Sequence, residues 1–332
     1  MKRFSIALVL ASVVGIAAAA QQPAKAPYSP PKTAWGDPDL TGIWPSTDMV
    51  GVPFERPANL GERTEVTQEE FEARLKQQQT RSAADAEETV STAPRQGDGT
   101  GPPSHWLEWG RASHQASLIV EPTNGRLPDT TPEAQRRAAS LKNTYVMFDG
   151  FADPGELGPY DRCISRGPLG SIFPVIYNNG NQIFQFPGYV VIRYEMIHEV
   201  RVVPLDGRGH LSPKIRTYMG DPRGHWEGNT LVVETTNLNG RTGAQGNGNL
   251  LMLSDDATIV ERYTRIAPDT LQYEVTVNDP RTWTKLWKAS FPLRREMSYG
   301  MFEYACHEGN HAMHNILSAS RAADKAATGG VQ

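Results

Sequence analysis

The residues that most directly suggest chemistry form the run His307-Glu308-Gly309-Asn310-His311 near the C-terminus. The run has the H-E-x-x-H pattern, in which a helix places two histidines one turn apart around a zinc ion. Gly309 and Asn310 argue against such a helix, because glycine costs about 1 kcal/mol in a helix interior and asparagine prefers the N-cap. We therefore predict a turn, followed by a helix that Asn310 caps, with His307 and Glu308 as acid–base candidates.

Two other interpretations of this turn stay open. Cys306, His307 and His311 are residue types that bind a divalent metal, so a metal-binding protein is an alternative. His307 and Glu308 would otherwise only satisfy backbone groups around the turn. No cofactor is predicted from the sequence, although a divalent metal is compatible with this alternative.

A second candidate lies in the run from Gly220 to Asn229, which we interpret as a polar and aromatic loop before an apolar strand. Asp221 and His225 provide groups for proton transfer, and Trp226 provides a ring for stacking on a ligand. The alternative is a hairpin in which Trp226 packs in the interior and the residues after it form the turn.

A third set surrounds the two cysteines of the chain, Cys163 and Cys306. In an oxidising compartment two cysteines tend to pair, and this bridge would close a loop of about 140 residues. Arg162 and Arg166 are candidates for anchoring an anionic substrate. The disulfide would bring them to the His307 turn, at one end of the predicted barrel. Free structural thiols or a reactive cysteine are the alternatives, and Tyr304 is a further substrate-binding candidate.

The N-terminus predicts the compartment. Lys2 and Arg3 precede an uncharged run from Phe4 to Ala20 that ends in three alanines, which is the order of a secretory signal peptide. We therefore expect residues 1–20 to be removed and the mature protein to be periplasmic or secreted. The apolar run is short for a spanning helix, and no later segment is apolar enough to span a membrane.

Composition excludes several classes of protein. The 332 residues carry a net charge of −4, which argues against nucleic-acid binding, since that needs clustered positive charge. Apolar residues make up 39% of the chain, enough for a globular core. There is no glycine-rich phosphate loop, no G-x-S-x-G elbow and no paired C-x-x-C, so nucleotide-dependent chemistry, α/β-hydrolase action and a zinc ribbon are unsupported.

The pattern of apolar residues predicts a mainly β fold, with an antiparallel meander that forms a barrel-like, lipocalin- or calycin-like body and a few peripheral helices. Residues 21–150 are expected to form an extended arm and peripheral helices, residues 151–325 the body, and residues 326–332 a tail. Helices are predicted over residues 64–84, over residues 132–142 and from Asn310 to near Lys325. The predicted strands are Ile172–Tyr177, Gln182–Phe186, Tyr189–Glu195, Glu199–Pro204, Thr230–Thr236, Thr258–Ile266, Leu271–Asn278 and Trp283–Leu293.

The chain resembles a large family of exported bacterial proteins of uncharacterised activity. The resemblance covers most of the mature chain and implies export, but no reaction and no catalytic residue. His311 departs from the pattern, since an aromatic residue is expected there. The opening Leu-Thr-Gly-Ile-Trp is also similar to the Gly-x-Trp start of lipocalin-like barrels. The markers are Asp37–Trp44, Ser117–Pro122, Asn124–Arg126, Cys163 with Gly167-Pro168, Gly224–Thr235, Glu261–Tyr263, Asp279-Pro280 and Cys306–Asn310.

Together these observations favour an exported enzyme that acts on a small organic molecule by acid–base chemistry, as a lyase, isomerase or hydrolase, in a barrel pocket. The first alternative is a non-catalytic, lipocalin-like binding protein of the periplasm. The second is the metal-binding protein described above.

Overall fold

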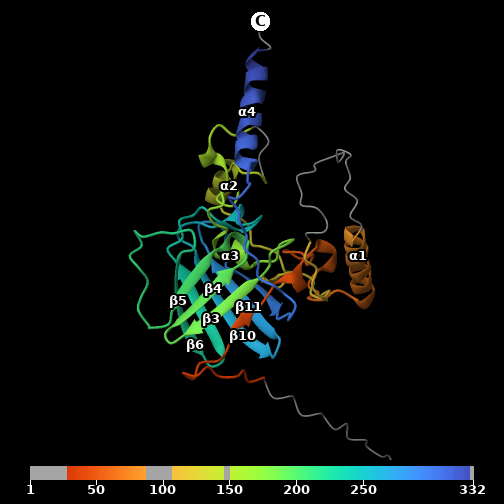
Figure 1. The fold of residues 1–332 in the computed structure, drawn as a ribbon, viewed down its shortest axis with the longest axis vertical. Helices are drawn as coiled ribbons and strands as arrows, with labels where there is room; N and C mark the ends of the chain where they lie inside the picture. Colours follow the sequence, from red (N-terminus) through yellow and green to blue (C-terminus); the bar gives the residue numbers. More distant parts are fainter. Residues whose placement is uncertain (1–27, 87–106, 146–149, 330–332) are drawn as a thin grey trace, which may run out of the picture.

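The computed structural model describes residues 28–86, 107–145 and 150–329. The predicted mainly β, antiparallel fold with few helices is confirmed. In these residues the strands form a four-stranded sheet in the order β1-β3-β4-β5, a six-stranded sheet in the order β2-β12-β11-β10-β7-β6, and a hairpin of β8 and β9. Figure 1 shows the four-stranded sheet in front of the six-stranded one, with α4 rising from one end and α1 at the side.

The bounds of the elements follow. The strands are β1 (Gly42–Ile43), β2 (Ile119–Glu121), β3 (Asn181–Phe186), β4 (Tyr189–Tyr194), β5 (Val200–Pro204), β6 (Asp221–Glu227), β7 (Thr230–Thr236), β8 (Gly243–Gln245), β9 (Leu250–Met252), β10 (Thr258–Ala267), β11 (Thr270–Asn278) and β12 (Trp287–Arg294). The helices are α1 (Gln68–Ala86), α2 (Pro132–Ala139), α3 (Gly167–Ile172) and α4 (Ala312–Gly329), with short 3-10 turns η1 (Thr47–Met49), η2 (Ala58–Leu60), η4 (Pro154–Glu156) and η5 (Met196–His198).

Two strand predictions were wrong. The apolar run Ile172–Tyr177 forms no strand: α3 ends at Ile172, and Pro174, which has no backbone N–H, follows it. Conversely, the run predicted as a polar loop is strand β6, which pairs with β7 along its whole length. Its proline is tolerated because β6 is an edge strand and needs hydrogen bonds on one side only.

The strands do not close into a barrel in the described part of the chain. With β5 next to β6, closure would need a hydrogen-bonded ladder between these two strands and another between β1 and β2, and the strands of each pair belong to different sheets. Side chains fill the contact instead: a Cβ on Gly224 of β6 would lie 2.7 Å from Cγ1 of Val203 and 2.6 Å from Cδ2 of Leu205. The two sheets therefore pack through side chains at this corner.

A buried ion pair joins the two sheets. Arg201 on β5 donates to Glu261 on β10 at 2.6 and 3.1 Å, and both side chains are fully buried. The hydroxyls of Tyr263 and Tyr273 donate to the same carboxylate, at 2.8 and 3.1 Å. Burial alone would lower the pKa of Arg201, but Glu261 together with Tyr194 and Tyr263 outweighs burial and holds that pKa well above its ordinary value.

The N-terminal arm is part of this body. Strand β1 pairs with β3 and strand β2 with β12, so the arm contributes to both sheets. Leu40, Trp44 and Ile119 are fully buried in the main core. The predicted signal peptide lies outside the described residues. None of the described helices is long and apolar enough to cross a membrane.

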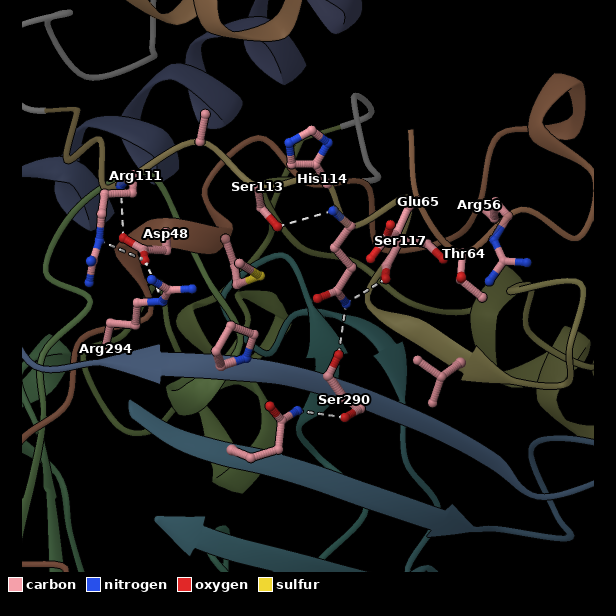
Figure 2. Close-up of a pocket in the computed structure, with 16 residues that line it drawn as sticks. Asp48, Arg56, Thr64, Glu65, Arg111, Ser113, His114, Ser117, Ser290 and Arg294 are labelled. Atoms are coloured by element: carbon pink, nitrogen blue, oxygen red, sulfur yellow. Dashed lines mark hydrogen bonds and ion pairs between the residues drawn. The ribbon is translucent and has the colours of Figure 1, made fainter. Parts of the chain in front are cut away.

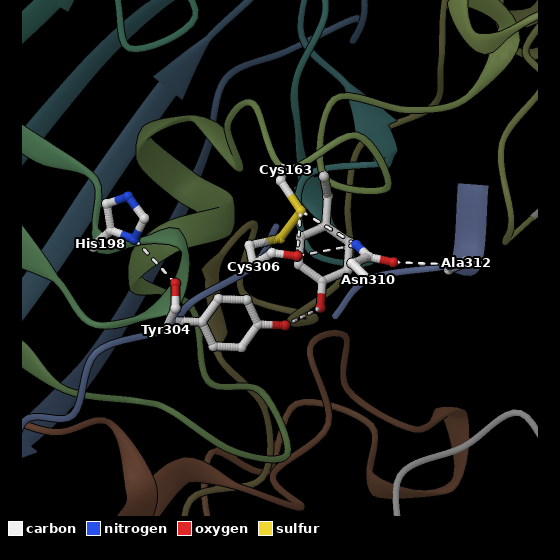
Figure 3. Close-up of a disulfide and its surroundings, with 7 residues drawn as sticks. Cys163, His198, Tyr304, Cys306, Asn310 and Ala312 are labelled. Atoms are coloured by element: carbon white, nitrogen blue, oxygen red, sulfur yellow. Dashed lines mark hydrogen bonds between the residues drawn. A yellow bond between two sulfur atoms is a disulfide. The ribbon is translucent and has the colours of Figure 1, made fainter. Parts of the chain in front are cut away.

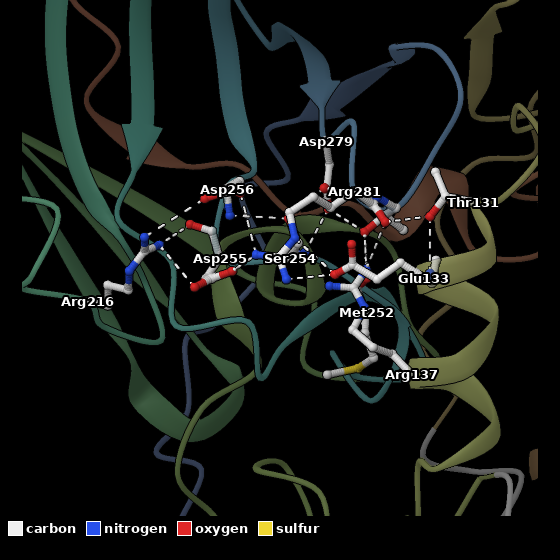
Figure 4. A network of polar contacts seen from close by, with 12 residues as sticks. Thr131, Glu133, Arg137, Arg216, Met252, Ser254, Asp255, Asp256, Asp279 and Arg281 are labelled. Atoms are coloured by element: carbon white, nitrogen blue, oxygen red, sulfur yellow. Dashed lines mark hydrogen bonds and ion pairs between the residues drawn. The ribbon is translucent and has the colours of Figure 1, made fainter.

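The predicted helices are present. Thr67 and Glu70 form a capping box at the start of α1, in which the side chain of each residue accepts from the backbone N–H of the other, at 3.2 and 2.7 Å. Thr131 caps α2, accepting from the backbone N–H of Ala134 at 3.1 Å. Arg281 connects α2 with the sheet. It contacts Glu133 of α2 at 2.6 Å, and it also contacts Asp255 and Asp256, which lie just before β10 (Figure 4). Helix α4 begins at Ala312, as expected, and runs past Lys325 to Gly329.

The buried pair generates a stability prediction. Glu261→Gln leaves the Arg201 charge buried without its partner, so we expect the free energy of unfolding to fall by about 3–5 kcal/mol. Urea unfolding at neutral pH measures it. The matched control is Glu227→Gln, which breaks the exposed pair with Arg262 and should change the free energy of unfolding far less, because solvent screens that pair. Equal losses in the two variants would contradict the prediction.

Candidate functional site

The predicted disulfide is present. Cys163 and Cys306 are bonded, with their Cα atoms 5.7 Å apart and a sequence separation of 143. Beside the bridge, the hydroxyls of Tyr160 and Tyr304 lie 3.4 Å apart, and the ring of His198 contacts the carbonyl oxygen of Tyr304 at 3.0 Å (Figure 3). The bridge therefore fixes the segment of Tyr304 against that of Tyr160.

The predicted turn and helix after Cys306 are also present. His307 and Glu308 lie exposed on the turn, and Asn310 caps α4 by accepting from the backbone N–H of Ala312 at 2.9 Å. His307 and His311 therefore do not share a helix. The sulfur of Cys306 is bonded to Cys163, so it offers no thiolate to a metal. The described ranges contain no group of three metal-ligating side chains.

The two candidate arginines near Cys163 have different surroundings. Arg166 is 1% exposed, and burial lowers its pKa to about 10. The neighbouring Tyr160 has its pKa raised by burial, so its hydroxyl stays neutral. Arg162 is half-buried and lines a cleft of about 280 Å³ whose other charged residues are Lys142, Glu156 and Arg241.

The candidates on β6 are not brought together. Asp221 and His225 are four residues apart on one strand, which separates them by about 13 Å. The side chain of His225 is 60% exposed and contacts Glu227 at 3.2 Å. Trp226 packs partly against the main core, as its hairpin interpretation predicted.

Asp221 contacts a different histidine, which sequence reasoning did not select. Its Oδ2 lies 3.1 Å from Nδ1 of His210, and its Oδ1 lies 2.8 Å from Arg223. The other ring nitrogen of His210 lies 2.9 Å from Glu234 on β7. His210 is isolated in the sequence, so no local pattern signals this contact.

A larger cleft, of about 560 Å³, lies on the outer face of β11 and β12, where the N-terminal arm covers the six-stranded sheet. Figure 2 shows a guanidinium-rich end with Arg111, Asp48 and Arg294, and an opposite end with Arg56, Thr64 and Glu65. The lining residues are Asp48, Met49, Arg56, Thr64, Glu65, Arg111, Ala112, Ser113, His114, Gln115, Ser117, Val120, Gln272, Ser290, Pro292 and Arg294.

At the first end, one buried carboxylate serves two arginines. Asp48 on η1 lies 3.5 Å from Nε of Arg111 and 3.2 Å from Nε of Arg294, and it accepts from the backbone N–H of Arg111 at 2.8 Å. The backbone of Gly110 lies so close to that of Asp48 that a Cβ on Gly110 would be 2.5 Å from the Asp48 nitrogen. Nη2 of Arg111 also lies 3.9 Å from the exposed carboxylate of Asp269, which does not line the cleft, so Asp48 is the one carboxylate that both guanidinium groups share.

The floor of the cleft is neutral and polar. Alternation on β11 and β12 turns Gln272 and Ser290 outward, and the amide of Gln272 donates to the hydroxyl of Ser290 at 2.8 Å. Gln115 from the arm donates to the carbonyl oxygens of Ser117 and Ser290, each at 2.7 Å. At the rim, the His114 ring stacks on Phe71 with centroids 3.8 Å apart.

Arg56 carries the positive charge at the opposite end. Its side chain is 2% exposed, and Nη1 donates to the carbonyl oxygen of Thr123 at 2.7 Å. Its Nε is buried and has no hydrogen-bond partner in the part of the chain that the structure describes. The cleft thus contains three guanidinium groups and two carboxylates, and its neutral surfaces are amides and hydroxyls. Such a lining suits a polar organic anion.

Comparison with protein-family models, with curated proteins and with solved structures finds no match for this chain.

The disulfide generates the second prediction. The double variant Cys163→Ala/Cys306→Ala should be less stable than the oxidised wild type by up to about 5 kcal/mol, because the bridge restricts the unfolded chain over a long loop. Urea unfolding with and without reductant measures it. Reductant should destabilise the wild type and leave the double variant unchanged; a wild type indifferent to reductant would contradict the prediction.

Proposed function

We propose that this is an exported protein that binds a small polar organic anion, such as a hydroxy acid or sugar acid, in the cleft between the N-terminal arm and the six-stranded sheet. The observation that carries the proposal is the sharing of buried Asp48 by Arg111 and Arg294. The signal-peptide pattern and the resemblance to exported bacterial proteins support export.

The cleft suits this class of ligand in size and polarity. Its volume of about 560 Å³ falls within the range of small-molecule sites. A carboxylate at the Arg111 end would receive charge-assisted hydrogen bonds, which are stronger than neutral ones. Ligand hydroxyls would meet Ser113, Gln272 and Ser290 along the floor, so the neutral part of the ligand should also be hydrophilic.

The position of the cleft modifies the lipocalin-like expectation. In a lipocalin-like carrier the ligand occupies the barrel interior, whereas here the space between the sheets contains Arg201, Glu261 and buried tyrosines. The ligand of our proposal lies on the outer face of one sheet. The proposal thus keeps the predicted role of a binding protein, with the site outside the space between the sheets.

Acid–base catalysis is the second candidate, and the contact between Asp221 and His210 favours it. A carboxylate that holds one ring nitrogen orients the imidazole, as in many acid–base sites. This pair lies at β6, four strands from β12, which corresponds to about 19 Å. It is therefore too far away to act on a ligand in the large cleft, and binding is the function that the geometry supports better.

The proposal predicts that gluconate binds measurably more tightly than glucose, which has no carboxylate. Arg294→Gln should weaken gluconate binding by roughly tenfold or more, because hydrogen bonds to charged groups contribute about 1.5–3 kcal/mol. Isothermal titration calorimetry at low ionic strength measures both. Arg262→Gln is the matched control, since Arg262 is exposed on β10 and does not line the cleft.

Equal affinity for the two sugars, or equal affinity in the two arginine variants, would contradict the proposed site. NMR of each mixture over time separates the two candidate functions. Conversion of the acid to a product by the wild type, but not by Asp221→Asn, would favour the enzyme.

A further inference from the structure

Among the described residues, two arginines are almost completely buried and differ in their partners. Arg201 and Arg166 are each 1% exposed. The guanidinium of Arg201 donates to Glu261, Tyr194 and Thr235. In Arg166, both Nε and Nη2 are buried and have no hydrogen-bond partner among the described residues. The Nε of Arg201 is likewise buried without a hydrogen-bond partner in the described part of the chain, but its charge is paired with Glu261, whereas Arg166 keeps two unpaired donors there.

Glu199 is the carboxylate that interacts with Arg166, but it does not pair with the guanidinium. Glu199 interacts electrostatically with Arg166, but its Oε1 accepts from the hydroxyl of Ser165 at 2.7 Å. Its Oε2 faces the backbone N–H of Arg166 at 3.4 Å, not the guanidinium. The side-chain charge of Arg166 is thus only partly balanced.

Four tyrosines interact electrostatically with this charge, and Tyr177 is one of them. Tyr145, Tyr160 and Tyr304 all interact electrostatically with Arg166. The hydroxyls of Tyr160 and Tyr304 lie 3.4 Å apart, and that of Tyr145 accepts from the amide of Asn247 at 2.6 Å. Burial raises the pKa of Tyr145 and of Tyr160, so these phenols remain neutral hydrogen-bond donors.

The two unpaired donors have the geometry of an anion site. Nε–H and one Nη2–H lie parallel on one edge of the planar guanidinium, and such an edge binds a carboxylate through two hydrogen bonds. An isolated buried charge is costly unless it gains a partner. We infer that Arg166, with the hydroxyls of Tyr145, Tyr160 and Tyr304, binds the carboxylate group of a small ligand.

The cluster has a route to solvent. The side chain of Tyr145 is 41% exposed, while Tyr160 and Tyr304 are half-buried. The 280 Å³ cleft beside Pro159 is lined by Arg162 and two other cationic residues against one glutamate, so its field attracts anions. The disulfide keeps Tyr304 in place opposite Tyr160.

This site is independent of the large cleft, because the cluster and the lining of that cleft share no residue. The test therefore uses the Arg294→Gln background, in which the large cleft contributes little. Acetate is the probe, chloride at equal ionic strength is the control, and phosphate is a second anion. Thermal unfolding and calorimetric titration are the two readouts.

We expect acetate to raise the Tm of this background beyond the effect of chloride. Adding Arg166→Met should abolish that response and leave the Tm without acetate equal or higher, because it removes a buried charge that lacks a full partner. Adding Arg201→Met instead should lower the Tm strongly, since Glu261 is then buried without its cation. Tyr304→Phe keeps the charge and should weaken acetate binding several-fold.

Three results would overturn the inference. One is an Arg166→Met variant that loses as much Tm as Arg201→Met, which would make Arg166 a structural residue. Another is an acetate response no larger than that of chloride, or one that Tyr304→Phe leaves unchanged. The third is a response to phosphate without a response to acetate, which would remove the carboxylate assignment.

Discussion

The ion pair between Arg201 and Glu261 is the constraint on which the arrangement of the two sheets depends. It connects β5 with β10 across the core, where neither charge meets water. A slip of one residue in β5 would turn Arg201 to the outer face and leave Glu261 buried alone. Tyr263 and Tyr273 complete the carboxylate's hydrogen bonds, so the polar group is satisfied only in the observed register.

This filled interior determines where ligands can bind. Because charged and aromatic side chains occupy the space between the sheets, the clefts lie outside it, against the N-terminal arm and the disulfide region. The arm is well suited to form a wall, since β1 and β2 attach it to both sheets. Residues between these two strands, including Asp48 and Arg111, are thus held over the outer face of β12.

The sequence predicts the regular strands well, because their alternation records one buried face. Strand β7 matches its predicted bounds, and β10 and β11 differ from theirs by one residue at one end. Strand β6 was missed because its Asp-Pro-Arg-Gly start has the composition of a turn, which only its edge position makes compatible with a ladder. The run from Ile172 was overpredicted because Ile172 and Phe173 are buried by tertiary packing without a partner strand.

The candidate sites also divide into those whose residues lie together in the sequence and those whose residues come from separate segments. Arg166 and the disulfide lie in short segments with many unusual residues, so sequence alone selected them. Asp48, Arg111 and Arg294 come from three separate segments, and no local spacing relates them.

The two buried arginines differ in a way that no sequence motif indicates. Arg201 and Arg166 are equally hidden from solvent, but the partners of Arg201 account for a structural role. Arg166 has unpaired donors that no contact within the described chain explains. Because burying a charge costs stability, a chain retains such a residue most readily where the charge has a function.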